Sequence, residues 1–280
     1  MFFRQFRNNV INLQFNTLRL MIDTHSHLYL EEFDCDRQEA VTRAKQAGVE
    51  KVILPNVDEN TLPSLLELEQ SENNYFFAAI GLHPTSVNAN FKEQLEFVEN
   101  ELARRKYIAI GEIGLDFYWD KTFVKEQIAA FKQQIMWAVK YNLPVIVHSR
   151  DSFDECFDIV KKYDDLTGVF HSFGGDINQA KKIISLNGRF KMGINGVVTF
   201  KNSGLSHFLK EIPLEYIVLE TDAPYLTPVP FRGKRNESAH LTLVAKKLSE
   251  IYEIEQSEIE KQTVKNTLAL FKNILNKANA

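Results

Sequence analysis

The chain has 280 residues, of which 44% are hydrophobic, 11% aromatic and 25% charged, and its formal net charge is −4. This composition is typical of a soluble globular protein and excludes a disordered or collagen-like chain. The slight acidity argues against extended, sequence-independent binding to duplex nucleic acid, which requires a strongly basic face.

Residues 1–20 differ in composition from the rest of the chain. They contain Arg4, Arg7 and Arg19 and no acidic residue, and Asn and Gln interrupt every apolar run, which argues against a secretory signal. A mitochondrial presequence is an alternative that the absence of serine disfavours. We predict that residues 1–20 are a poorly ordered extension, or precede a true start at Met21, and that residues 21–280 form a single barrel domain.

The cysteines and the apolar runs indicate the cellular setting. Cys35 and Cys156 are too few for a disulfide framework, so we expect a reducing, cytoplasmic environment. The longest apolar runs, such as 51–55 and 144–148, are far shorter than the roughly 20 residues that cross a bilayer. We therefore predict no membrane association, and no obligate protein partner is evident.

From Met21 onward, short β-branched runs alternate with amphipathic segments of helical period, which is the pattern of repeated βα units. The predicted strands are 20–23, 49–55, 76–81, 108–112, 145–148, 169–173, 190–194 and 217–220. Helical patterns between them include 34–47, 121–141, 151–163 and 176–186. Eight strands, each followed by a helix, predict an α/β fold of the (β/α)8 TIM-barrel type.

Residue types that bind metals follow five of the predicted strands. They are His25 and His27 after the first strand, Glu112 at the fourth, His148 at the fifth, His171 at the sixth and Asp222 at the eighth. The carboxyl ends of barrel strands meet at one mouth, where barrel enzymes have their active sites. We therefore expect these six residues to converge although they are far apart in sequence.

The residue types predict a centre with two divalent cations. His25 and His27, two positions apart on extended chain, point to the same side and can hold one cation, which Asp222 could complete. Glu112 has two oxygens and could bridge to a second cation held by the histidines of the fifth and sixth strands. Each residue alone has a structural explanation, but four imidazoles and two carboxylates at one mouth need cations to offset their burial.

A compact basic cluster follows the eighth strand and is a candidate substrate contact. Arg232, Lys234 and Arg235 could bind phosphate, the arginines through a bidentate fork and the lysine as a point charge. The alternative is a solvated loop or an ion pair with Glu237.

Two further residues are candidate substrate contacts near the mouth. His83 could contact a phosphate or a metal-bound water, or be a core histidine satisfied by the backbone. Arg150 could reach the mouth, or pair with Asp151 or Glu155. Of the aromatic residues that follow strand ends, we expect one or two to stack on an unpaired base: Phe117, Tyr118, Trp119, Phe173 and Tyr225.

Seven motifs together resemble one family. They are IDTHSHL at 22–28, AIGLHP at 79–84, AIGEIGLDFY at 109–118, VHSR at 147–150, FHSF at 170–173, LETDAPYLTP at 219–228 and RGKRNE at 232–237. In this order they resemble the TatD-like metal-dependent deoxyribonucleases, within the amidohydrolase-type barrels, from Met21 to about Lys277. The sequence departs from the common family pattern at Ser26, Gly174 and Ser238, none of which is a predicted ligand.

The resemblance implies a metal-dependent hydrolase of DNA phosphodiesters whose ligands are the six strand-end residues. Glu112 and Asp222 are then the catalytic residues, with Asp222 orienting or deprotonating the attacking water. The resemblance implies Mg²⁺, whereas the imidazoles favour Zn²⁺ or Mn²⁺. A narrow mouth and an acidic protein suggest an exonuclease that prefers single-stranded or frayed DNA.

Two alternatives remain open. The same centre could hydrolyse esters or amides, for example as an aminoacyl-tRNA deacylase, which also has a phosphate-bearing substrate. A binding protein that has lost catalysis is disfavoured because all six ligand positions hold competent residues.

Overall fold

The computed structural model describes residues 20–275, so the predicted extension lies almost entirely outside the described residues. Within this range the strands are β1 (Met21–Asp23), β2 (Val49–Pro55), β3 (Phe76–Ala79), β4 (Ile110–Asp116), β5 (Val145–Arg150), β6 (Gly168–Phe170), β7 (Phe190–Ile194) and β8 (Ile217–Leu219). All pair in parallel with their sequence neighbours, in the orders β1-β2-β3 and β4-β5-β6-β7-β8.

Backbone contacts join these two groups of strands into a barrel. A bridge between Ile80 and Ile110 links the end of β3 to β4. On the other side, Thr24 N donates to Leu219 O at 3.0 Å, which links β1 to β8. The predicted TIM-type barrel is confirmed, since the strands run in sequence order around a closed ring.

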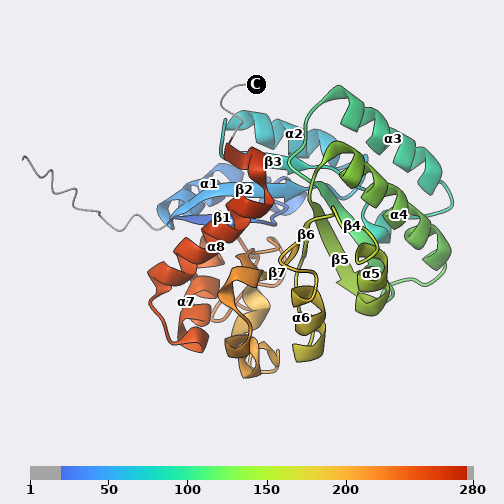
Figure 1. The fold of residues 1–280 in the computed structure, drawn as a ribbon. Coiled ribbons are helices and arrows are strands. Elements are labelled where there is room, and N and C mark those ends of the chain that lie inside the picture. The colour runs from blue at the N-terminus through green and yellow to red at the C-terminus, as the bar shows by residue number, and fades with distance from the viewer. Residues whose placement is uncertain (1–19, 276–280) are drawn as a thin grey trace, which may run out of the picture.

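The helices form a layer around the strands (Figure 1). They are α1 (Arg37–Gln46), α2 (Leu62–Ser71), α3 (Phe91–Arg104), α4 (Val124–Tyr141), α5 (Phe153–Val160), α6 (Ile177–Ile184), α7 (Leu241–Tyr252) and α8 (Gln256–Leu270). In α3 the buried side chains are Leu95, Val98 and Leu102, whose helical spacing gives one apolar face. Within residues 20–275, every helix is too short or too polar to cross a bilayer.

Two predicted details of the βα pattern are wrong. No α-helix follows β7, because the segment up to β8 contains Gly204 and Pro213 and folds into short 3₁₀ turns instead. The fourth strand does not end at Glu112 but continues to Asp116, pairing with β5 up to Arg150. Glu112 therefore lies inside a strand rather than at its end.

Alternate strand residues fill the barrel interior. Ile53, Phe77, Ile146 and Val218 belong to one buried cluster, and their sequence neighbours pack outward against the helices. The segment that follows α8 adds Phe271 to the same interior cluster. Because this apolar packing fills the interior, a ligand site can open only at the strand ends.

Asp23 joins the beginning of the barrel to its end. Its buried carboxylate accepts hydrogen bonds from Thr221 N at 2.9 Å, Thr221 Oγ1 at 2.6 Å and Ser238 Oγ at 2.7 Å. Burial raises the pKa of Asp23 to about 7, although these hydrogen bonds act in the opposite direction. Ser238, at one of the positions that depart from the common family pattern, thus donates a hydrogen bond to the residue that links β1 to β8.

Candidate metal centre

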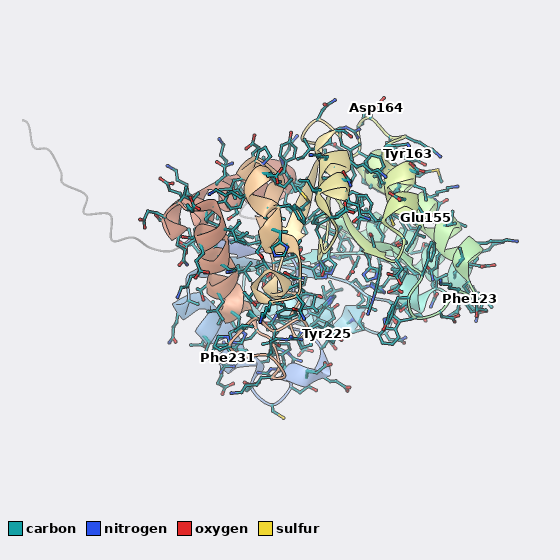
Figure 2. All side chains as sticks on the ribbon, turned by 90° about the horizontal axis from the view of Figure 1, so that it is seen from below. Phe123, Glu155, Tyr163, Asp164, Tyr225 and Phe231 are labelled. Atoms are coloured by element: carbon teal, nitrogen blue, oxygen red, sulfur yellow. The ribbon has the colours of Figure 1, made fainter. Side chains whose placement is uncertain are left out.

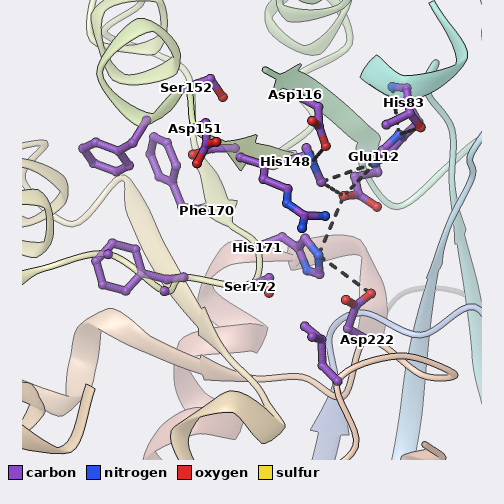
Figure 3. Close-up of a pocket in the computed structure, with 18 of the residues that line it drawn as sticks. His83, Glu112, Asp116, His148, Asp151, Ser152, Phe170, His171, Ser172 and Asp222 are labelled. Atoms are coloured by element: carbon purple, nitrogen blue, oxygen red, sulfur yellow. Dashed lines mark hydrogen bonds and ion pairs between the residues drawn. The ribbon is translucent and has the colours of Figure 1, made fainter. Parts of the chain in front are cut away.

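The structure brings the six predicted ligands together at the carboxyl end of the barrel. A cavity opens there, and five of the six line it: His27, Glu112, His148, His171 and Asp222. His25 is fully buried. Figure 3 shows the contacts that connect this group to His83 and Asp116. The convergence expected from the strand order is therefore present.

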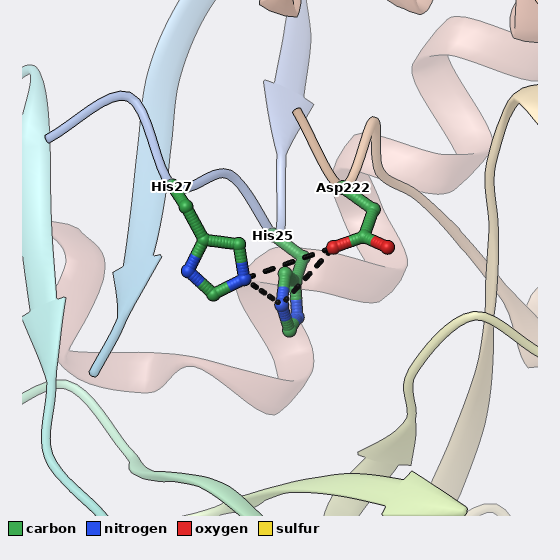
Figure 4. Close-up of side chains that lie close together, drawn as sticks. All are labelled: His25, His27 and Asp222. Carbon is green, nitrogen blue, oxygen red and sulfur yellow. Dashed lines mark hydrogen bonds and ion pairs between the residues drawn. The ribbon is translucent and has the colours of Figure 1, made fainter. Parts of the chain in front are cut away.

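His25, His27 and Asp222 form the first part of the centre (Figure 4). The Nε2 atoms of the two histidines are 3.1 Å apart, and Asp222 Oδ1 lies 3.7 Å from each of them. The two imidazoles thus point to the same side, as their spacing predicts. Two nitrogens and one carboxylate oxygen facing a common point suit a divalent cation.

Glu112 lies between two groups of histidines. Its Oε2 is 3.1 Å from His25 Nε2 and 3.7 Å from His27 Nε2. Its Oε1 is 2.8 Å from His148 Nδ1 and 3.7 Å from His171 Nε2. Each carboxylate oxygen therefore faces a different pair of imidazoles, which is the arrangement required of a bridging ligand.

The hydrogen bonds of His27 fix which nitrogen carries its proton. Tyr29 Oη donates to Pro55 O at 2.6 Å, so it accepts from His27 Nδ1, which is 2.8 Å away. The proton of neutral His27 consequently lies on Nδ1. Its Nε2 lone pair is left facing His25 and Glu112, ready to bind a cation.

Carboxylates also face the other two lining histidines, through a hydrogen bond at His148 and at ion-pair distance at His171. Asp116 Oδ2 lies 3.0 Å from His148 Nε2, and Glu220 Oε1 lies 3.1 Å from His171 Nδ1. Since a carboxylate only accepts, each imidazole turns its remaining nitrogen toward Glu112. A lone pair at His148 Nδ1 facing Glu112 Oε1 at 2.8 Å requires a proton or a cation between them.

His83 differs from these ligands in its tautomer. Its Nδ1 accepts from Thr85 N at 3.1 Å, so the proton of a neutral His83 lies on Nε2. That Nε2 is 3.3 Å from Glu112 Oε1 and 3.3 Å from His148 Nδ1. His83 therefore presents an N–H donor to the site, and its role as a substrate contact stays a prediction.

The buried groups have strongly altered acidities. Burial lowers the pKa of His25 and lowers that of His27 to about 4, so both imidazoles are neutral at pH 7. Burial opposes ionisation of Glu112, yet the surrounding histidines hold its pKa well below the ordinary value. Burial raises the pKa of Asp222 to about 7. On the other side of Glu112, burial is outweighed by the nearby carboxylates, which raise the pKa of His148 and raise that of His171 to about 10. Without a cation, the negative charge of this centre therefore attracts protons, and a divalent cation can take their place.

The predicted basic cluster does not line the cavity. Arg235 pairs with Asp36, and the two shortest N–O distances are 2.6 and 2.8 Å. The Arg232 guanidinium lies over the Phe200 ring, 4.1 Å from its centre, and Lys234 contacts the ring of the neighbouring Phe231. Phe231 and Tyr225 both project from the loop after β8 (Figure 2). The role of the cluster as a substrate contact stays a prediction.

The family described as "TatD related DNase" matches residues 22–272. The chain belongs to the TatD family. YabD of Bacillus subtilis and YjjV of Escherichia coli, both described as uncharacterized metal-dependent hydrolases, are 37% and 34% identical to this TatD protein. The alignments cover 90% and 89% of the chain and 99% and 97% of YabD and YjjV. This TatD protein is a metal-dependent hydrolase.

Solved structures support the same fold. The crystal structure of E. coli YjjV matches this TatD protein with a TM-score of 0.85 and 33% identity, over 91% of this chain and 99% of that one. A TatD family hydrolase from Entamoeba histolytica matches with a TM-score of 0.76 over 90% and 98% of the two chains. Its identity of 22% supports the fold alone. The resemblance to the TatD family that the seven motifs indicate is confirmed.

Three supporting residues of this TatD protein are missing from the sequence prediction. Tyr29, Asp116 and Glu220 each contact a histidine of the predicted centre on the side away from Glu112. Asp116 and Glu220 lie inside quoted motifs, and Tyr29 follows one closely. A polar residue two to four positions from a ligand, in a buried run, is a signal that could have identified all three.

Proposed function

We propose that this metal-dependent hydrolase is a deoxyribonuclease that removes nucleotides from single-stranded or frayed DNA ends with two divalent cations. The observation that carries the proposal is the position of Glu112, whose two oxygens face two separate pairs of imidazoles. Sites with two bridged cations are suited to displacement at phosphorus. The cytoplasmic location of the protein stays a prediction, which rests on its having only two cysteines.

The residues of the centre divide into two sets of ligands around Glu112. One cation would be held by His25, His27 and Asp222, and the other by His148 and His171. Such cations, when bound, lower the pKa of water and neutralise the charge of a phosphodiester. We propose Mg²⁺ as the working ion, with Zn²⁺ or Mn²⁺ as alternatives that imidazole ligands favour.

The side chains of the protein position the reactants. Asp222, a buried carboxylate with a pKa raised to about 7, orients the attacking water and accepts its proton. The N–H at His83 Nε2 donates to a phosphate oxygen, and Arg150 at the cavity wall binds the phosphate charge.

The charges around the cavity favour a chain end over a long stretch of DNA. Arg150 is the single lysine or arginine among the residues that line the cavity, and three carboxylates share its wall: Asp151, Glu155 and Asp154, of which Asp154 is paired with Lys182. A polyanion laid across this wall would be repelled. One terminal phosphodiester, directed at the cations, avoids the carboxylates.

The test is hydrolysis of end-labelled single-stranded DNA by chelator-stripped protein reloaded with Mg²⁺, Mn²⁺ or Zn²⁺. We expect metal-dependent shortening from one end, reduced by orders of magnitude in Glu112→Ala with little change in circular dichroism. Cleavage of closed circular DNA at a comparable rate would contradict the exonuclease, and full activity of Glu112→Ala would contradict the bridged centre.

A second candidate is hydrolysis of an aminoacyl ester at the end of a charged tRNA. The observation that favours it is the same acidic wall, since Asp151 and Glu155 could bind the ammonium group of an aminoacyl ester next to Arg150. Aminoacyl esters and DNA assayed side by side with the same metal-loaded protein separate the two functions.

A further inference from the structure

Trp119 is the most exposed large apolar side chain of the described residues. Its exposed fraction is 69%, against 3% for Trp137, the other tryptophan of the chain. Trp119 nevertheless lines the cavity that contains the metal centre. An indole that is uncovered at a cavity wall offers a flat apolar surface to a ligand.

The backbone that carries Trp119 is fixed to the metal centre. Tyr118 N and Trp119 N donate to Asp116 Oδ1 at 2.9 and 3.2 Å. The other oxygen of Asp116 accepts from His148 Nε2 at 3.0 Å. One carboxylate thus positions both a metal-binding imidazole and the aromatic loop, so the distance between them is set before a ligand binds.

Arg150 lies against the same aromatic residues. Its guanidinium is 3.8 Å from the centre of the Tyr118 ring and 5.1 Å from that of Trp119. Within residues 20–275 it forms no ion pair, although Asp151 and Glu155 are close in sequence. Stacking therefore orders this cation while its charge stays available to an anion.

We propose that Trp119 and Arg150 form a subsite for one terminal nucleotide, in which the base stacks on Trp119 and the phosphate binds Arg150. The proposal rests on the proposed nuclease function and specifies its substrate contact. The indole of Trp119 beside the guanidinium of Arg150 matches the base and the single phosphate of one nucleotide. The carboxylates of Asp151 and Glu155 on the same wall would repel further phosphates. Stacking on an indole accepts any of the bases, so the subsite predicts weak sequence preference.

Ligand binding to the full chain loaded with Mg²⁺ tests the subsite directly. The probes are deoxyadenosine 5′-monophosphate and 2-deoxyribose 5-phosphate, which lacks the base. We expect only the nucleotide to quench tryptophan fluorescence, because Trp119 is exposed and Trp137 is buried. By calorimetry, Trp119→Ala weakens nucleotide binding about tenfold and leaves the sugar phosphate unchanged. Trp119→Phe retains most of the affinity.

Two further variants complete the experiment. Arg150→Gln weakens both probes by a similar factor, and Met136→Ala, which removes an exposed apolar side chain on α4 outside the cavity, changes neither. Unchanged nucleotide affinity in Trp119→Ala, or an equal loss for both probes, overturns the subsite.

DNA cleavage separates this proposal from the nuclease function. With oligonucleotides whose terminal residue is either intact or abasic, wild-type protein prefers the intact end and Trp119→Ala treats the two alike. If Trp119→Ala cleaves the intact and the abasic substrate more slowly by the same factor, the subsite is overturned and the nuclease function stands. If wild-type protein cleaves neither end with any metal, the nuclease function fails, and the probe comparison alone decides the subsite.

Discussion

Asp116 and His148 are joined across two neighbouring strands, with 3.0 Å between Asp116 Oδ2 and His148 Nε2. The pairing of β4 with β5 places Asp116 opposite Arg150, two residues beyond His148. The longer β4 therefore has a function in the site, because a strand that ended at Glu112 would leave this imidazole without its acceptor. Supporting contacts of this kind orient metal-binding histidines and raise their basicity.

Asp116→Ala is expected to lower the affinity for divalent cations by about 10- to 100-fold while the barrel stays folded. Without the acceptor, the His148 imidazole can rotate and expose either nitrogen. Competition with a chelating dye measures the affinity, and circular dichroism checks the fold. Asp120→Ala, on the exposed loop that follows β4, is the matched control, and an equal loss in both variants would contradict the role of Asp116.

His83→Ala is expected to retain the metal content of the wild type and to lose about 10²-fold in kcat, because an N–H donor rather than a lone pair faces the site. His25→Ala, in contrast, removes a buried predicted ligand and is expected to lose bound metal. Elemental analysis of the two purified variants, together with steady-state kinetics, measures the difference. A metal-free His83→Ala protein would show that His83 is itself a ligand.

The sequence predicts which residues converge at the mouth better than it predicts the residues that support them. His25, Glu112 and Asp222 can be chosen because histidines and carboxylates are rare in buried strands and at their ends, and the strand order directs them to one mouth. Which carboxylate lies behind which imidazole depends on the register between strands. Glu220 is next to β8 in sequence but contacts His171 after β6, a relationship that no local pattern specifies.

The basic cluster after β8 shows the same limit. The spacing of the three basic residues in the sequence cannot show where their loop leads. In the structure, the loop packs against α1 and the residue before α1. Arg235 reaches Asp36, and Glu237 binds Arg43 with 2.6 Å between Oε2 and Nη2. The alternative of an ion pair with Glu237 thus names the right kind of contact but the wrong partner, since Arg235 and Glu237 each pair with a residue almost 200 positions away.

Gly193→Ala is expected to disturb the centre through Glu220. A Cβ at position 193 would lie 2.0 Å from Glu220 Oε2, so the carboxylate that supports His171 has to move. We expect a loss of about 1–3 kcal/mol in the free energy of unfolding and a weaker affinity for divalent cations.

The double variant Gly193→Ala/Glu220→Ala separates the two effects of this substitution. Removing the carboxylate relieves the clash, so part of the stability should return in urea unfolding, while metal affinity stays low. Recovery of metal affinity in the double variant would show that Glu220 does not position His171.

Asp36→Asn is expected to destabilise the protein in a manner that depends on pH. Hydrogen bonds from Arg235 and Arg43 lower the pKa of Asp36 from 3.8 to about 2. A carboxylate with a lowered pKa stabilises the folded state above its unfolded pKa, and this contribution is lost as the pH falls from about 4 toward 2. Because a third of the side chain is exposed, solvent screening limits the contribution to about 1 kcal/mol.

Urea unfolding at pH 7, 5 and 3 measures this contribution. The free energy of unfolding of Asp36→Asn should lie about 1 kcal/mol below that of the wild type at pH 7 and 5, and the difference should shrink at pH 3. Asp164→Asn, on an exposed loop, is the control and should follow the wild type throughout. A difference that persists unchanged at pH 3 would mean that Asp36 stabilises the fold through packing, because protonation would then leave its contribution intact.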